Sequence, residues 1–167
     1  MKRHRFFWLA AILLGHISTA TAADVTITVN GRVVANACTI GTVNANVALG
    51  NLNTFSLVSA GATSSWQTVN LSLTNCPIGT SRVTAKFTGT SDSTGNYFKN
   101  AGNAGNIALQ LGDSSGKNIQ NGGSLTTTVN DSSRSAYFAL QVRAISPAGS
   151  ATQGTIQSTI DVTYTWL

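Results

Sequence analysis

The sequence lacks the side chains that most enzymes use for catalysis. It contains no glutamate, and its two histidines, His4 and His16, both lie near the N-terminus. General acid–base catalysis and most metal sites use histidine or paired carboxylates, whereas the five aspartates lie apart from one another, next to Ser, Gly, Val or Thr. A Ser–His–Asp triad cannot be assembled from these residues. We therefore expect no enzyme, no metal site, no cofactor and no small-molecule substrate.

The sequence also has no apolar run long enough to span a membrane as a helix. Three cations among the first five residues precede an apolar run over 6–15, and small residues follow up to Ala22. This order is typical of a secretory signal peptide, and the apolar run is shorter than the ~20 residues that a spanning helix needs. We predict that residues 1–22 are a signal peptide and that the protein is exported. Cleavage after Ala23 is the alternative to cleavage after Ala22.

Clustered positive charge is the third absence. Removal of residues 1–22 leaves seven of the ten Lys and Arg against five Asp, a net charge of +2. The remaining cations are scattered singly, without the basic stripe that phosphate binding uses, so we expect no nucleic-acid partner. The segment Gly112–Asn118 has three residues between its glycines where a phosphate-binding loop has four, and we interpret it as an ordinary loop.

Only two cysteines are present, Cys38 and Cys76. In an exported protein the default interpretation is a disulfide, which would stabilise the fold by roughly 4 kcal/mol on the chain-entropy model. A reactive thiol pair or a metal site is the alternative, although no histidine remains after export to assist either of them.

Apolar residues recur at a spacing of two between Gly, Asn and Ser clusters, and no sustained helical period follows the signal peptide. This pattern predicts a single all-β domain of the sandwich type. The expected strands include Val43, Val47 and Leu49; Val69, Leu71 and Leu73; Val83, Ala85 and Phe87; Ile107, Leu109 and Leu111; Leu125 to Val129; and Phe138 to Ile145.

The segment from Ala23 to Asn36 is longer and more regular than an average strand. Its odd-numbered positions carry small or apolar residues over about eleven positions, so one face is suited to burial. These positions are Val25, Ile27, Val29, Gly31, Val33 and Ala35. The alternative is a hairpin at Asn30-Gly31. A hairpin would place an apolar face opposite a mixed one, and we therefore favour a straight strand.

The last residues form a second long alternating segment, which ends at the chain terminus. We predict a strand from Gly154 to Leu167 whose apolar face ends in aromatic residues. That face carries Ile156, Ile160, Val162, Tyr164 and Trp166.

The mature chain resembles the chaperone-usher pilins and, within them, the minor tip subunits of type 1 fimbriae. The resemblance covers essentially the whole mature chain and rests on several motifs together. These are Ala-Asp-Val-Thr-Ile-Thr-Val-Asn-Gly at 23–31, Leu-Thr-Asn-Cys-Pro at 73–77, Gly-Thr-Ser-Arg-Val-Thr-Ala at 79–85, Gln-Val-Arg-Ala at 141–144 and Ala-Thr-Gln-Gly-Thr-Ile at 151–156.

The resemblance implies an incomplete immunoglobulin-like sandwich that lacks its final strand. It also implies a donor-strand extension at 23–37, carrying the odd-numbered residues named above, ahead of a pilin domain at 38–167. A periplasmic chaperone would fill the open groove and pair with a C-terminal strand that includes Gly154, Ile160, Val162, Tyr164, Trp166 and Leu167. Gly154 is fourteenth from the end, as in the family, whereas Trp166 replaces the usual penultimate Tyr.

The function that the resemblance implies is a structural adaptor of the fimbrial tip on the cell surface. Its partners would be the chaperone, the outer-membrane usher, the pilin domain of an adhesin and a neighbouring tip pilin, joined by strand addition. One alternative is a carbohydrate-binding adhesin, although adhesins of this kind have two domains and 145 mature residues leave room for one. Another minor or major pilin of the same family is the second alternative.

Overall fold

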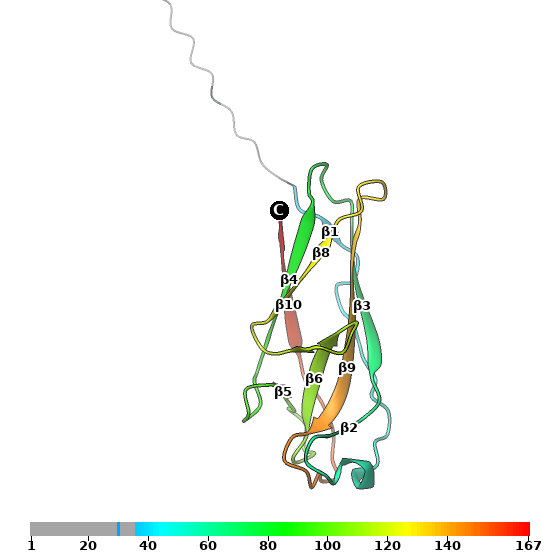
Figure 1. Cartoon of the computed structure of the whole chain (residues 1–167), viewed down its shortest axis with the longest axis vertical. Helices are drawn as coiled ribbons and strands as arrows, with labels where there is room; N and C mark the ends of the chain where they lie inside the picture. Colours follow the sequence, from blue (N-terminus) through cyan, green and yellow to red (C-terminus); the bar gives the residue numbers. More distant parts are fainter. Residues whose placement is uncertain (1–29, 31–35) are drawn as a thin grey trace, which may run out of the picture. The chain divides into compact units, whose positions relative to one another are not determined.

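The computed structural model describes Asn30 and residues 36–167. The predicted signal peptide and all six predicted donor positions, Val25 to Ala35, lie outside the described residues. The chain divides into two units at Val33, and the fold described below belongs to the second unit. Apart from a short 3-10 helix, Thr54–Leu57, its regular elements are β-strands (Figure 1).

The strands form two antiparallel sheets. The first has the order β1-β3-β9-β6-β5, with β2 paired to β9 and β7 paired to β6. Its strands are β1 Thr39–Ile40, β2 Ala62–Thr63, β3 Gln67–Thr74, β5 Phe98–Lys99, β6 Ala108–Asp113, β7 Asn118–Ile119 and β9 Ala136–Ser146. The second has the order β10-β4-β8, built from β4 Arg82–Gly89, β8 Ser124–Thr128 and β10 Ile160–Trp166. The all-β prediction is confirmed.

The core lies between the two sheets, as the alternation predicted. In β4 the side chains of Val83, Ala85 and Phe87 are at most 1% exposed. They belong to one apolar cluster with side chains of the first sheet, chiefly Leu71, Leu73, Leu109, Leu111, Phe138 and Leu140. Because successive side chains of a strand point to opposite faces, this burial confirms the expected inward faces of β3, β4, β6 and β9.

Two predicted strands differ from the structure. The segment containing Val43, Val47 and Leu49 forms no strand, and Val43 is 78% exposed. Its backbone pairing with β3 ends at Gly41, whose N–H donates to Ser72 O, and Thr42 bonds to Ser72 only through its hydroxyl. Residues 43–49 therefore have the alternation of a strand without a paired strand.

The C-terminal strand is shorter than the sequence predicts. It begins at Ile160 instead of Gly154, because Ile160 pairs with Gly89, the last residue of β4. Beyond that residue β4 offers no further ladder positions. Residues 154–159 therefore continue the segment without a strand partner in the second sheet.

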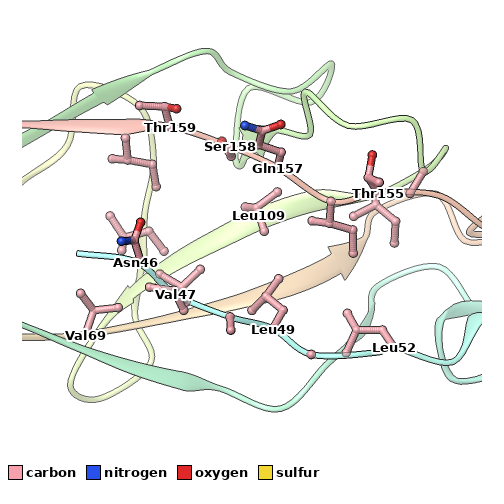
Figure 2. A pocket seen from close by; sticks show the side chains of 18 of the residues that line it. Asn46, Val47, Leu49, Leu52, Val69, Leu109, Thr155, Gln157, Ser158 and Thr159 are labelled. Atoms are coloured by element: carbon pink, nitrogen blue, oxygen red, sulfur yellow. The ribbon is translucent and has the colours of Figure 1, made fainter. Parts of the chain in front are cut away.

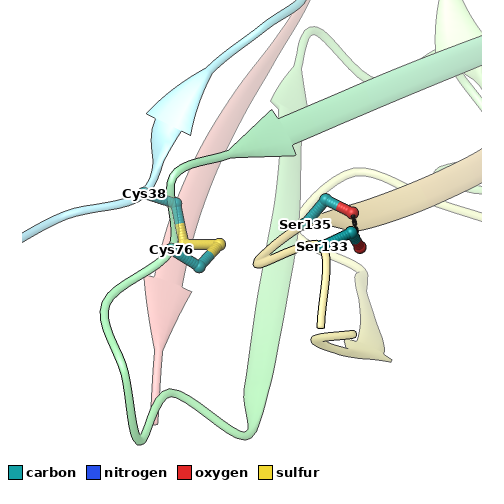
Figure 3. Close-up of a disulfide and its surroundings, with 4 residues drawn as sticks. All are labelled: Cys38, Cys76, Ser133 and Ser135. Carbon is teal, nitrogen blue, oxygen red and sulfur yellow. Dashed lines mark hydrogen bonds between the residues drawn. A yellow bond between two sulfur atoms is a disulfide. The ribbon is translucent and has the colours of Figure 1, made fainter. Parts of the chain in front are cut away.

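The predicted disulfide is present between Cys38 and Cys76 (Figure 3). Both residues are buried, at 5% and 0% exposure, and they join the residue before β1 to the turn that follows β3. Cys76 also donates its backbone N–H to Arg134 O. The bridge thus fixes the entry of the domain against its first long strand.

The segment Gly112–Asn118 is a tight turn, in agreement with the loop interpretation. The Asp113 carboxylate accepts hydrogen bonds from Ser115 Oγ, Ser115 N and Lys117 N. These bonds, the Ser115 hydroxyl first, lower the pKa of Asp113. The Asp113 carboxylate therefore already accepts from the backbone N–H groups that a bound phosphate would need.

Within residues 36–167 the structure contains no helix with the length and apolar character of a membrane span.

Loss of the disulfide should destabilise the domain without changing its sheets. The cysteines are 38 residues apart, so a Cys38→Ser/Cys76→Ser double substitution should lower the free energy of unfolding by about 4 kcal/mol. Urea denaturation of the oxidised protein and the variant measures the difference. A variant as stable as the oxidised protein would show that the bridge constrains nothing.

Alkaline pH should weaken the packing of β10 through Tyr164. Its ring centroid lies 5.9 Å from that of Phe138, and desolvation raises the pKa of its phenol. A raised pKa in the folded state means that this contribution to stability is complete below the unfolded pKa, near 10. The contribution is lost as the pH rises through the folded value.

Urea denaturation between pH 9 and 11 tests this expectation. The stability of Tyr164→Phe should fall less over this range than that of the unsubstituted protein. Tyr137→Phe is the matched control, because Tyr137 is 62% exposed. Equal pH dependence in all three proteins would contradict the assignment.

Candidate functional site

The surface of the domain contains an open groove of about 870 Å³ with an apolar floor. One wall is the extended segment 45–52 and the other is the segment 151–160, continuing to Val162 in β10. Figure 2 shows these walls on opposite sides of the groove, with Leu109 between them. Side chains from both sheets form the floor, namely Val69, Leu71, Phe87, Leu109, Leu111, Leu140 and Val142.

The groove is open because two sheet edges beside it are incompletely paired. In the described part of the chain β10 pairs only with β4, so its other edge has no strand. The outer edge of β3 is paired only at Thr74 and Leu73, opposite β1. An unpaired edge leaves a row of N–H and C=O groups that another strand can pair with. The domain is therefore a sandwich with the place of one strand empty.

The predicted C-terminal residues lie on this edge. Gly154, Ile160 and Val162 line the groove. Tyr164 and Trp166 follow on the same face, and together with Ile160 and Val162 they pack against the core while remaining only partly buried. Leu167 exchanges backbone hydrogen bonds with Arg82, and its side chain is 76% exposed. The structure brings these six residues together along one edge.

The second wall was not identified as part of a site from the sequence. Val47 and Leu49 alternate as expected for a strand, and both are half-buried and line the groove. The alternation correctly predicted that Val47 and Leu49 turn inward and was wrong for Val43, which is exposed. It carried no information on whether a neighbouring strand or a groove would receive them.

The groove is lined by apolar, amide and hydroxyl side chains. Among the described residues no group of three or more His, Cys, Asp or Glu is placed to hold a metal ion. Backbone groups along an apolar floor suit an extended peptide that adds as a strand, with alternate side chains entering the groove.

Comparisons with known proteins agree with this description. The family model for the Fimbrial protein family matches residues 25–165. The protein FimG of Escherichia coli K12 is 59% identical over 97% of this chain and 96% of its own length. The uncharacterised fimbrial-like protein YdeR of the same strain is 51% identical over 99% of both chains. The S-fimbrial adhesin protein SfaS of an Escherichia coli O6 strain is 40% identical over 89% of this chain and 88% of its own length.

Solved structures of low sequence identity share the fold. The P pilus rod subunit PapA has a TM-score of 0.65 at 18% identity, covering 79% of this chain and 100% of its own. A subunit in the structure of a chaperone-usher pilus has a TM-score of 0.66 at 20% identity, covering 90% of this chain and 99% of its own. The predicted pilin sandwich is thereby confirmed. By the family match and the identity over nearly its full length, the chain belongs to the fimbrial protein family.

Proposed function

We propose that the groove accepts a β-strand from a neighbouring pilus subunit and that residues 23–35 of this chain are the strand it donates to another. The observation that carries the proposal is the unpaired edge of β10 beside an apolar floor. A strand placed there would pair with the backbone of β10 and cover Ile160 and Val162, which are only partly buried. Strand addition would supply hydrogen-bond partners for the backbone of β10 and cover for these apolar side chains at once.

The donor is proposed from its matching pattern. The odd-numbered positions from Val25 to Ala35 form one small-to-apolar face. Burying four branched aliphatic side chains, Val25, Ile27, Val29 and Val33, contributes about 1.5 to 3 kcal/mol for each. Because the acceptor completes its core only with a donor in place, affinity for the donor also acts as folding stability. A joint of this kind should dissociate very slowly.

The partners proposed for these surfaces follow the resemblance to chaperone-usher pilins. A periplasmic chaperone would occupy the groove first, at the edge from Gly154 to Leu167, and the arm of the next tip pilin would replace it at the outer-membrane usher. The arm of this chain would complete the pilin domain of an adhesin. The identity of 59% with FimG supports a role as adaptor of the fimbrial tip.

A second candidate function is direct adhesion, since SfaS, 40% identical to this chain, is named an adhesin. The described residues form one domain, and the groove suits an extended peptide better than a glycan. A glycan array with the strand-complemented protein separates the two functions. Specific glycan binding would favour the adhesin.

The donor role predicts that charge is tolerated on one face of the arm and excluded from the other. Ile27→Asp would place a carboxylate in an apolar groove and should abolish complex formation with an adhesin pilin domain. Thr28→Asp, one residue away on the opposite face, should leave the complex intact. Size-exclusion chromatography of the co-expressed proteins measures both.

Deletion of residues 23–35 is the stronger form of the same test and should also abolish the complex. A stable complex with the deleted chain would overturn the donor role. Equal behaviour of Ile27→Asp and Thr28→Asp would contradict the proposed buried face.

A further inference from the structure

The backbone of the C-terminal segment alternates between a paired side and an open side. Leu167 N–H donates to Arg82 O at 3.0 Å, and Arg82 N–H donates to Leu167 O at 3.2 Å. Because hydrogen-bonded and non-hydrogen-bonded pairs alternate in an antiparallel ladder, odd-numbered residues of β10 direct their peptide groups to β4. Even-numbered residues such as Val162 direct theirs to the open edge. Phe87, opposite Val162, accordingly bonds to Gly122 and Gly123 on its other side.

The same alternation continues beyond the end of β4. There the loop 100–104 takes the place of the strand. Gln157 N–H donates to Asn100 Oδ1 at 2.8 Å, and Gln157 O accepts from Ala101 N at 2.7 Å. Thr155 O accepts from Ala104 N at 3.0 Å. Thr155 and Gln157 are thus bonded on the same side as the odd-numbered residues of β10, whereas within residues 36–167 no hydrogen bond is made by the backbone of Ile156 or Ser158.

Asn100 is the centre of this loop and is 9% exposed. Its Oδ1 accepts from Gly102 N at 3.0 Å as well as from Gln157 N, and its Nδ2 donates to Ala104 O at 2.9 Å and to Thr155 O at 3.3 Å. Both ends of the amide are satisfied, which fixes the side chain. Asn103 supports it by accepting from the N–H and the hydroxyl of Thr155.

Two glycines allow the loop and the segment to approach this closely. A Cβ on Gly102 would lie 2.1 Å from Thr155 O, and one on Gly154 would lie 2.4 Å from Ala104 N. Gly154 also has a φ of 155°. Side chains at either position would push the segment away from the loop.

We propose that Asn100, supported by Asn103, is a positioning residue that lengthens the strand-accepting edge of the groove. It holds residues 155–157 in line with β10, so that Ile156 and Ser158 present their free peptide groups in register with Val162 and Tyr164. β10 alone supplies seven residues, whereas the aligned edge runs over the eleven residues from Ile156 to Trp166.

The occupant that fits this edge is an extended strand of about eleven residues, roughly 36 Å long. The alternating arm of this chain, Val25 to Ala35, has that length. The inference rests on the proposed function, because it assumes that the groove receives a strand. It adds that the part of the edge beyond β4, residues 156–159, depends on an asparagine side chain.

Amide hydrogen exchange, followed by NMR, tests the role of Asn100. The ¹⁵N-labelled mature chain is refolded with an excess of an unlabelled synthetic peptide that has the sequence of residues 23–36. Binding should raise the protection of the Ile156 and Ser158 amides by at least about tenfold, together with that of Val162 and Tyr164. In Asn100→Ala the gain at Ile156 and Ser158 should be lost, while the gain at Val162 and Tyr164 persists.

Two further variants keep the test decisive if Asn100→Ala folds poorly. Asn103 is exposed, so Asn103→Ala should fold and lose protection at Ile156 in the same direction. Asn70→Ala, on the exposed face of β3, is the matched control and should behave as the unsubstituted chain.

The outcomes separate the two proposals. Unchanged protection at Ile156 and Ser158 in Asn100→Ala, or equal loss along all of β10, would overturn the positioning role and leave strand acceptance standing. If the peptide protects no amide of the edge in the unsubstituted chain, strand acceptance itself fails, and the role of Asn100 fails with it.

Discussion

The structure depends on an unpaired strand edge that lies over an apolar core. β10 is bonded on one side only, and its inward side chains pack against the floor without being fully buried. A polar backbone edge requires hydrogen bonds and an apolar floor requires cover. Since one strand would supply both, the incomplete fold and the capacity to bind a partner are the same property.

The rest of the domain holds that edge in place. The disulfide between Cys38 and Cys76 ties the domain entry to the end of β3. On the opposite wall, β4 pairs with β10 as far as Gly89, and the loop around Asn100 continues the pairing to Thr155. The groove is therefore bounded by covalent and hydrogen-bonded supports, although no strand of the described residues pairs with the groove side of β10.

Membership of the fimbrial protein family places the chain among structural subunits of surface fimbriae, not among enzymes. This agrees with a composition without glutamate and with histidine only near the N-terminus. As a fimbrial protein it acts as one subunit among others, and its chemistry is that of association. Because the proposed donor arm and acceptor groove are different surfaces, subunits joined through them would all have the same orientation along the assembly.

The sequence alone determined the alternation and the inward faces of the main strands, and it predicted the disulfide that the structure confirms. Val83, Ala85 and Phe87 were assigned correctly because a period of two is a local property of the chain. Residues 43–49 and 154–159 have a similar alternation, yet the structure gives them no ladder. Pairing requires a second strand at the right place, and the sequence of one segment does not show where that second strand lies.

Only the tertiary structure decided where the edge is open and what supports it. Asn100 lies in the Gly- and Asn-rich stretch that follows β5. Its four hydrogen bonds reach Gly102, Ala104, Thr155 and Gln157, two of them more than fifty residues away. Local pattern cannot report such contacts, because they arise when the chain folds back on itself.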